Sequence, residues 1–97
     1  MDSHLPSIEV ETASDADGWT CFVRVSDETG SSEHHVRVRP ADVARFAPGS
    51  TEPVDLVRRS FQFLLAREPK ESILPAFDLP LIGRYFPEYK REIRRSS

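Results

Sequence analysis

Three histidines and one cysteine are the side chains of this 97-residue chain that bind transition metals most readily. His34 and His35 are adjacent in a segment with strand-like alternation, and neighbouring residues of a strand point to opposite faces. The two rings therefore cannot reach one ion without a bulge. His4 is far away in the sequence, and Cys21 has no Cys-x-x-Cys partner. We expect no metal site and no cofactor.

The side chains that could act as nucleophiles lack the neighbours that catalysis requires. Cys21 shares one side of an expected strand with Trp19 and Val23, where a thiol behaves as a small apolar group. No serine lies in a Gly-x-Ser-x-Gly motif, and the four glycines are too far apart for a phosphate-binding loop. Acidic pairs such as Asp15 and Asp17 are typical of an exposed loop. We expect this chain not to be an enzyme.

Arginines on one face of the expected sheet are the best candidates for binding a nucleic acid. Arg24 and Arg37 share that face with Phe22, and single-strand binders combine basic side chains with stacking aromatic rings. Glu9 and Glu11 lie on the same face and reduce its positive charge. The candidate phosphate-binding residues are Arg24, Arg37, Arg39, Lys90, Arg91, Arg94 and Arg95.

The aromatic stretch 77–89 is the best candidate for a protein interface, because tyrosine and arginine are enriched among the residues that anchor such interfaces. The candidate interaction residues are Phe22, Arg84, Tyr85 and Tyr89. We therefore expect a non-catalytic protein-interaction or accessory domain, with a protein partner or a second copy of the chain. The alternative is a small nucleic-acid-associated regulator that uses the arginines and the basic C-terminal tail.

Alternation with period two in the first half predicts a three-stranded antiparallel sheet over residues 7–39. Ile8 and Val10 alternate with glutamates, and residues 27–32 have the composition of a hairpin turn. Phe22 is an exception, because it falls on the polar face. Either a helix or a partner covers its ring, or a bulge turns it inward.

The second half of the chain predicts helices. A short helix is expected over 40–46, and a long amphipathic helix over 53–67, capped by Thr51 or Glu52. Its apolar arc is wide enough that the sheet must cover one side and the C-terminal segment the other. That segment is expected to form proline-broken helical turns, one of them capped by Asp78.

We therefore predict one α+β domain over residues 1–97, with a strand half at 1–50 and a helical half at 51–97. The half-chains differ in charge, since the first is acidic and the second carries a basic end. The expected core residues are Trp19, Val23, Val36, Val38, Val57, Phe61, Leu64 and Phe86.

Composition also indicates the expected surroundings of the chain. Thirteen basic and sixteen acidic residues give a net charge of −3, which argues against wholesale electrostatic binding to nucleic acid or to an anionic membrane. No apolar run approaches the ~18–20 residues that span a bilayer. A single cysteine cannot form a disulfide within the chain, so we expect a reducing, cytoplasmic setting.

The runs KESIL from Lys70 to Leu74 and FDLPLIGRYFPEY from Phe77 to Tyr89 resemble the end of a group of small uncharacterised prokaryotic proteins. The similarity extends to the FQFLL run that begins at Phe61 and to the strand half around its tryptophan. This resemblance implies a stand-alone compact domain and does not imply an activity.

Overall fold

The computed structural model describes residues 6–95, which form one sheet and a layer of helices. The strands are β1 (Ser7–Asp15), β2 (Gly18–Asp27), β3 (Gly30–Val38) and β4 (Ala76–Asp78), in the order β1-β2-β3-β4. The helices are α1 (Pro40–Phe46), α2 (Val54–Leu65), α3 (Leu81–Tyr85) and α4 (Tyr89–Arg95), with a short 3-10 helix at Lys70–Ser72. The α+β class is confirmed.

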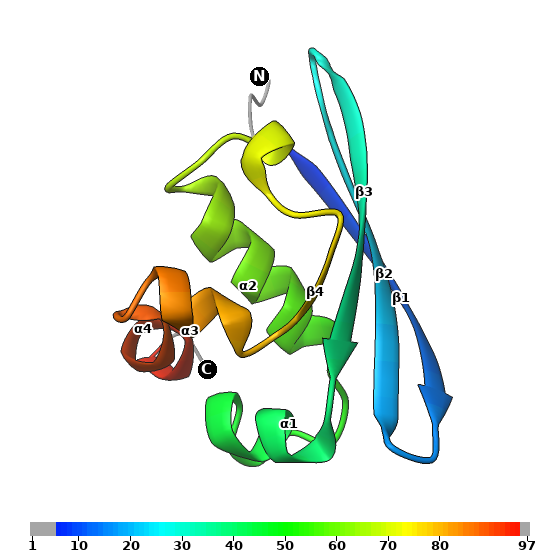
Figure 1. The fold of residues 1–97 in the computed structure, drawn as a ribbon, viewed down its shortest axis with the longest axis vertical. Coiled ribbons are helices and arrows are strands. Elements are labelled where there is room, and N and C mark those ends of the chain that lie inside the picture. The colour runs from blue at the N-terminus through cyan, green and yellow to red at the C-terminus, as the bar shows by residue number, and fades with distance from the viewer. Residues whose placement is uncertain (1–5, 96–97) are drawn as a thin grey trace.

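The sheet has one apolar and one polar face because side chains alternate along each strand. The buried inward-facing residues of β2 and β3 are Cys21, Val23, Val25, His34, Val36 and Val38. All of the helices lie on this side of the sheet (Figure 1), and no described element covers the other side. The polar face is therefore open to solvent.

The prediction of a three-stranded antiparallel sheet is wrong in one respect, because the short strand β4 joins β3 in parallel. Its two ends are held by backbone hydrogen bonds. The N–H of His35 donates to the carbonyl oxygen of Pro75 at 2.8 Å, and the N–H of Leu79 donates to that of Arg37 at 3.0 Å. Three residues are too few to show a period in the sequence. Asp78 ends this strand and does not cap a helix.

Helix α2 is buried on two sides, as its wide apolar arc predicted. Toward the sheet, the ring of Phe61 packs 5.2 Å from that of His34 and 6.2 Å from that of Phe77. Toward α4, Phe63 lies 5.2 Å from the ring of Tyr89, measured between ring centroids. Since both sides of α2 are covered, the helix forms the centre of the domain.

The cap of α2 differs from the prediction. Neither Thr51 nor Glu52 caps the helix, because it begins at Val54, one residue later than expected. Pro53 occupies the N-cap position, and its carbonyl oxygen accepts the first helical hydrogen bond from the N–H of Val57 at 2.8 Å. Proline is tolerated at the start of a helix because it has no N–H to leave without a partner.

The C-terminal helical turns are two short helices, α3 and α4, which are separated at Phe86 and Pro87. Most of the predicted core is confirmed, with Trp19 and Phe86 only partly buried at its margin. Among residues 6–95, no helix is both long enough and apolar enough to cross a bilayer.

Replacing Phe61, which is fully buried between α2 and the sheet, tests this packing. We expect Phe61→Ala to lower the free energy of unfolding by about 3–5 kcal/mol, because the substitution leaves a cavity. Its control is Gln62→Ala at the next, exposed position, which should change stability by less than about 0.5 kcal/mol. Urea denaturation measures both variants. A loss below about 1 kcal/mol for Phe61→Ala would contradict the packing described above.

Candidate functional site

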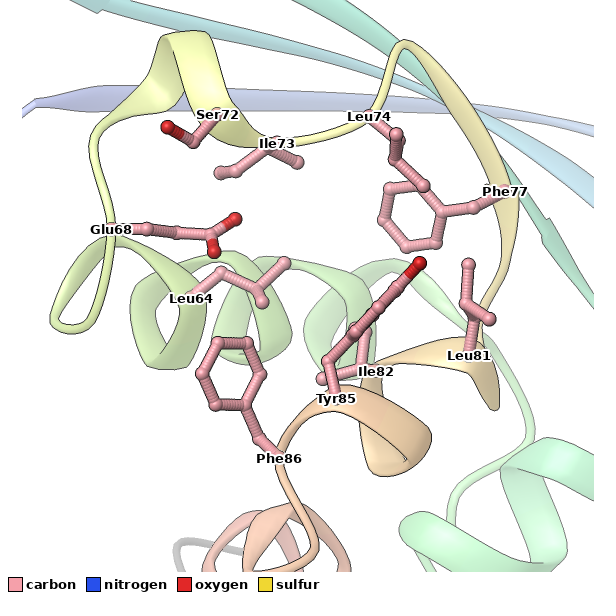
Figure 2. A pocket seen from close by; sticks show the side chains of 10 residues that line it. All are labelled: Leu64, Glu68, Ser72, Ile73, Leu74, Phe77, Leu81, Ile82, Tyr85 and Phe86. Carbon is pink, nitrogen blue, oxygen red and sulfur yellow. The ribbon is translucent and has the colours of Figure 1, made fainter.

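A groove of about 340 Å³ lies between the end of α2, the segment after the 3-10 helix, and α3 (Figure 2). It is lined by Leu64, Glu68, Ser72, Ile73, Leu74, Phe77, Leu81, Ile82, Tyr85 and Phe86. We refer to this feature as the apolar groove. Eight of its ten lining residues are aliphatic or aromatic. A concave surface of this composition is typical of a binding site.

Two side chains of the apolar groove are unusually exposed for their type. Leu74 is 43% exposed and Tyr85 is 66% exposed. Pro75 follows Leu74 and begins the segment that pairs with β3, which fixes the backbone beside the groove. Tyr85 is the last residue of α3, and its ring extends across the groove toward Phe77 (Figure 2). Their exposed surface is available to a binding partner.

Glu68 is the charged residue of the groove lining, and its carboxylate points into the groove (Figure 2). Within residues 6–95, this carboxylate forms no hydrogen bond and no ion pair. The two nearest bases in the sequence have other partners. Arg67 binds Glu88 and Glu92, each at 3.2 Å, and Lys70 binds Glu71 at 2.6 Å. The negative charge of Glu68 is therefore uncompensated by an ion pair.

The residues predicted to bind nucleic acid separate into two groups, because Lys90, Arg91, Arg94 and Arg95 lie on α4 and the other three on the open side of the sheet. Each of those three makes an ion pair there: Arg24 with Glu33 at 2.9 Å, Arg37 with Asp15 at 2.7 Å, and Arg39 with Asp78 at 3.7 Å. Glu9 of β1 lies opposite Arg24 in the sheet, yet Arg24 forms its ion pair with Glu33 of β3 on its other side. These three cations are thus partly neutralised by their own sheet.

Phe22 lies on the same open face and is 41% exposed. The register between β1 and β2 runs without interruption past it, so no bulge turns the ring inward. No helix of the described chain covers it either, and its one ring contact is edge-to-face with His35, at 4.9 Å between centroids. Phe22 is therefore an exposed aromatic ring on a charged surface.

His34 and Cys21 are core residues. His34 is only 2% exposed, and both of its ring nitrogens are engaged, with the Ser32 hydroxyl and the Leu74 carbonyl oxygen, each at 2.8 Å. Burial raises the pKa of the Cys21 thiol to about 11, which makes it a poor nucleophile. Among residues 6–95, no three acidic, histidine or cysteine side chains gather to hold a metal. His4 lies outside the described residues.

Lys70 is a buried ion that the sequence analysis did not identify. It is 4% exposed, and its ammonium group donates to Asp27 at 3.0 Å, Thr29 at 2.7 Å and Glu71 at 2.6 Å. The two carboxylates raise its pKa. Lysine is normally exposed, and two of these partners lie in the distant β2–β3 turn, so no local pattern indicates this cluster. It fixes the segment beside the apolar groove to the sheet.

The predicted interaction residues separate into two environments. Tyr85 lines the apolar groove, and Arg84 is exposed beside it on α3. The prediction that Tyr89 offers its hydroxyl to a partner is corrected, because this residue is fully buried and its hydroxyl lies 2.6 Å from that of Ser60. Burial raises the pKa of the Tyr89 hydroxyl above its ordinary value. Tyr89 therefore belongs to the core.

The Lys70 cluster predicts a pH dependence of stability. Hydrogen bonds from the Thr29 hydroxyl and from Lys70 lower the pKa of Asp27 from 3.8 to about 2. Because the folded chain has the lower pKa, the ionised carboxylate stabilises the fold above about pH 4, and this contribution is lost as the pH falls toward 2. We expect Asp27→Asn to lower the urea midpoint at pH 7 and to weaken its dependence on pH between 4 and 2.

Two features keep this prediction specific. Asp15, whose pKa is lowered to about 2 by Arg37, is unchanged in the variant and retains part of the slope. Asp17→Asn is the matched control, because the Asp17 carboxylate forms no ion pair within the described chain. Equal pH profiles for Asp27→Asn and the unmodified protein would contradict the role of the Lys70 cluster.

Comparison with protein-family models, with curated proteins and with solved structures found no match for this chain. The resemblance to small prokaryotic proteins therefore stays a prediction, and the function is argued from the geometry of the surface.

Proposed function

We propose that this chain is a non-catalytic protein-interaction domain and that its docking site is the apolar groove. The proposed occupant is a segment of another protein that presents apolar side chains together with one lysine or arginine. The observation that supports this proposal is the combination of an apolar lining with the exposed side chains of Leu74 and Tyr85. Binding would remove both from water, and burial of apolar area is the main favourable term in protein association.

The size of the apolar groove favours side chains as its occupants. Its volume of about 340 Å³ is near the lower end of the range for small-molecule sites, roughly 300–1,000 Å³. Such a space suits a few apolar side chains from one face of a helix or from a short loop. Tyrosine at its rim supplies a large contact area with few rotatable bonds, so little conformational entropy is lost on binding.

The charge of Glu68 defines the cationic part of the proposed partner. Its carboxylate has no ion-pair partner in residues 6–95, and Arg67 is held away from it. Arg67 also lies over the ring of Phe63, with its guanidinium carbon 3.6 Å from the ring centroid. A cation on the partner, next to its apolar side chains, would complement this carboxylate and orient the segment.

The groove lining favours binding over catalysis. Ser72 is its only aliphatic hydroxyl, and no histidine is present in the lining to activate it. The ion pairs of Arg24, Arg37 and Arg39 make the open sheet face a weaker candidate for nucleic acid, since each positive charge lies beside a negative one. Both observations support the protein-interaction proposal.

Selection from a random-peptide display library tests the proposed docking site. We expect enriched peptides that combine apolar residues with lysine or arginine. Binding of these peptides should fall about tenfold with Glu68→Lys, because an attraction is replaced by a repulsion. Tyr85→Ala should weaken binding as well. Both positions are at the surface, so circular dichroism should show an unchanged fold.

The matched control is Glu52→Lys, which reverses an exposed charge that precedes α2 and does not line the groove. Affinities for this variant should equal those of the unmodified protein. Peptides that bind all variants equally, or a selection that enriches no sequence, would refute the apolar groove as the docking site.

A further inference from the structure

Helix α4 presents a strongly basic face to solvent. Its four exposed bases lie at sequence positions i, i+1, i+4 and i+5, which span an arc of roughly 140° on a helix. We call this surface the basic face, and its residues are Lys90, Arg91, Arg94 and Arg95. The opposite side of α4 is held in the core by the buried residues Tyr89 and Ile93. The basic face therefore points away from the domain.

The charges of the basic face are not held in ion pairs in the described part of the chain, although Arg91 attracts the carboxylate of Glu88 from beyond ion-pair distance. None of its four cations forms an ion pair within residues 6–95. The nearest carboxylates in the sequence are Glu88 and Glu92, and both accept hydrogen bonds from Arg67. Four like charges on one helix face repel one another, so a negatively charged partner would be attracted to this surface.

A complementary surface exists on the open face of the sheet. Glu9 and Glu11 of β1 flank the exposed ring of Phe22 and line a hollow of about 350 Å³. Neither glutamate forms an ion pair within residues 6–95. Arg24 and Glu33 also line the hollow, but they neutralise each other. We call this surface the acidic hollow, and its net charge is negative because Glu9 and Glu11 add to the neutral pair of Arg24 and Glu33.

The acidic hollow has the side chains that bind an arginine or lysine. Carboxylates accept hydrogen bonds from a guanidinium or ammonium group, and an exposed aromatic ring attracts the same cation through its face. The ring of Phe22 is exposed on a face that no described helix covers. The basic face of α4 presents three arginines and one lysine within a single helix. The two surfaces are therefore chemically complementary.

The two surfaces of one chain cannot meet each other. The acidic hollow is on the open face of the sheet, whereas α4 is in the helical layer on the other side (Figure 1). We propose that the basic face of one copy binds the acidic hollow of a second copy. The contact is head-to-tail, so each copy keeps one free surface of each kind, and association continues in a row unless it closes into a ring. This proposal does not depend on the apolar groove.

Charge reversal combined with measurement of solution mass tests the proposal. Sedimentation and light scattering are carried out over a tenfold dilution at ionic strengths of about 0.01 M and about 1 M, where the screening length falls from about 30 Å to about 3 Å. We expect the mass of the unmodified protein to rise with concentration at low salt. At high salt it should be that of the monomer. The variants Arg91→Glu/Arg94→Glu and Glu9→Lys/Glu11→Lys should each be monomeric in both salts.

Two further experiments combine the charge reversals and distinguish loss of the proposed contact from unfolding of the variants. An equimolar mixture of the two variants should associate again at low salt. In the mixture, the glutamates introduced on α4 of one variant face the lysines introduced on β1 of the other. A single chain that carries all four reversals should self-associate for the same reason. Glu68→Lys, which alters only the apolar groove, should leave the mass unchanged, so failure of the docking proposal would be recognised separately.

Three results would overturn head-to-tail association. The unmodified protein could be monomeric at every concentration in low salt. Alternatively, its mass could rise with concentration but be insensitive to both reversals, which would assign association to another surface. Finally, the monomer could bind a polyanion such as heparin through α4 while the reversal of Glu9 and Glu11 has no effect. That last result would identify the basic face as a polyanion-binding surface.

Discussion

The two-sided burial of α2 is the constraint on which the rest of the domain depends. A sheet with one apolar face needs a cover, and α2 supplies it through Val57, Phe61 and Leu64. The same helix is too apolar to leave its second side in water. Ser60 lies on that side, and its hydroxyl donates to the carbonyl oxygen of Leu56 at 2.7 Å and lies 2.6 Å from the hydroxyl of Tyr89. These bonds satisfy polar groups that would be costly to bury alone, so α4 can pack directly against α2.

The apolar groove is a consequence of how the chain returns to cover α2. The segment that leaves α2 must cross back to the sheet, where Lys70 anchors it to the β2–β3 turn and β4 pairs with β3. α3 then turns the chain away from the sheet. Because this path is held at both ends by polar contacts, it cannot collapse fully onto α2. Leu74 and Tyr85 are left exposed over the space between them.

The charged side chains of the described chain are of two kinds. Some form ion pairs that connect parts of the fold, and others form no ion pair and can bind a partner. Arg24, Arg37 and Arg67 are held by Glu33 of β3, Asp15 of β1 and Glu92 of α4, so these charges connect separate elements of the fold. Glu68 and the bases of α4 lack such partners in the described chain. Exposed ion pairs contribute little to stability, whereas unpaired charges attract complementary surfaces and orient them. The unpaired groups are therefore the ones on which both proposals are built.

Elements with a regular pattern of apolar residues could be predicted from the amino-acid sequence. Alternation in the first half predicts the three long strands, and the three-to-four spacing around Phe61 predicts α2 and its two covered sides. These patterns are local, because the geometry of a single strand or helix decides which of its residues face the core. The pairing of β4, the burial of Lys70 and Tyr89, and the position of Glu68 in the groove became visible only in the folded chain. Each of these features depends on contacts between segments that are distant in the chain. The spacing of residues within one segment cannot predict such contacts.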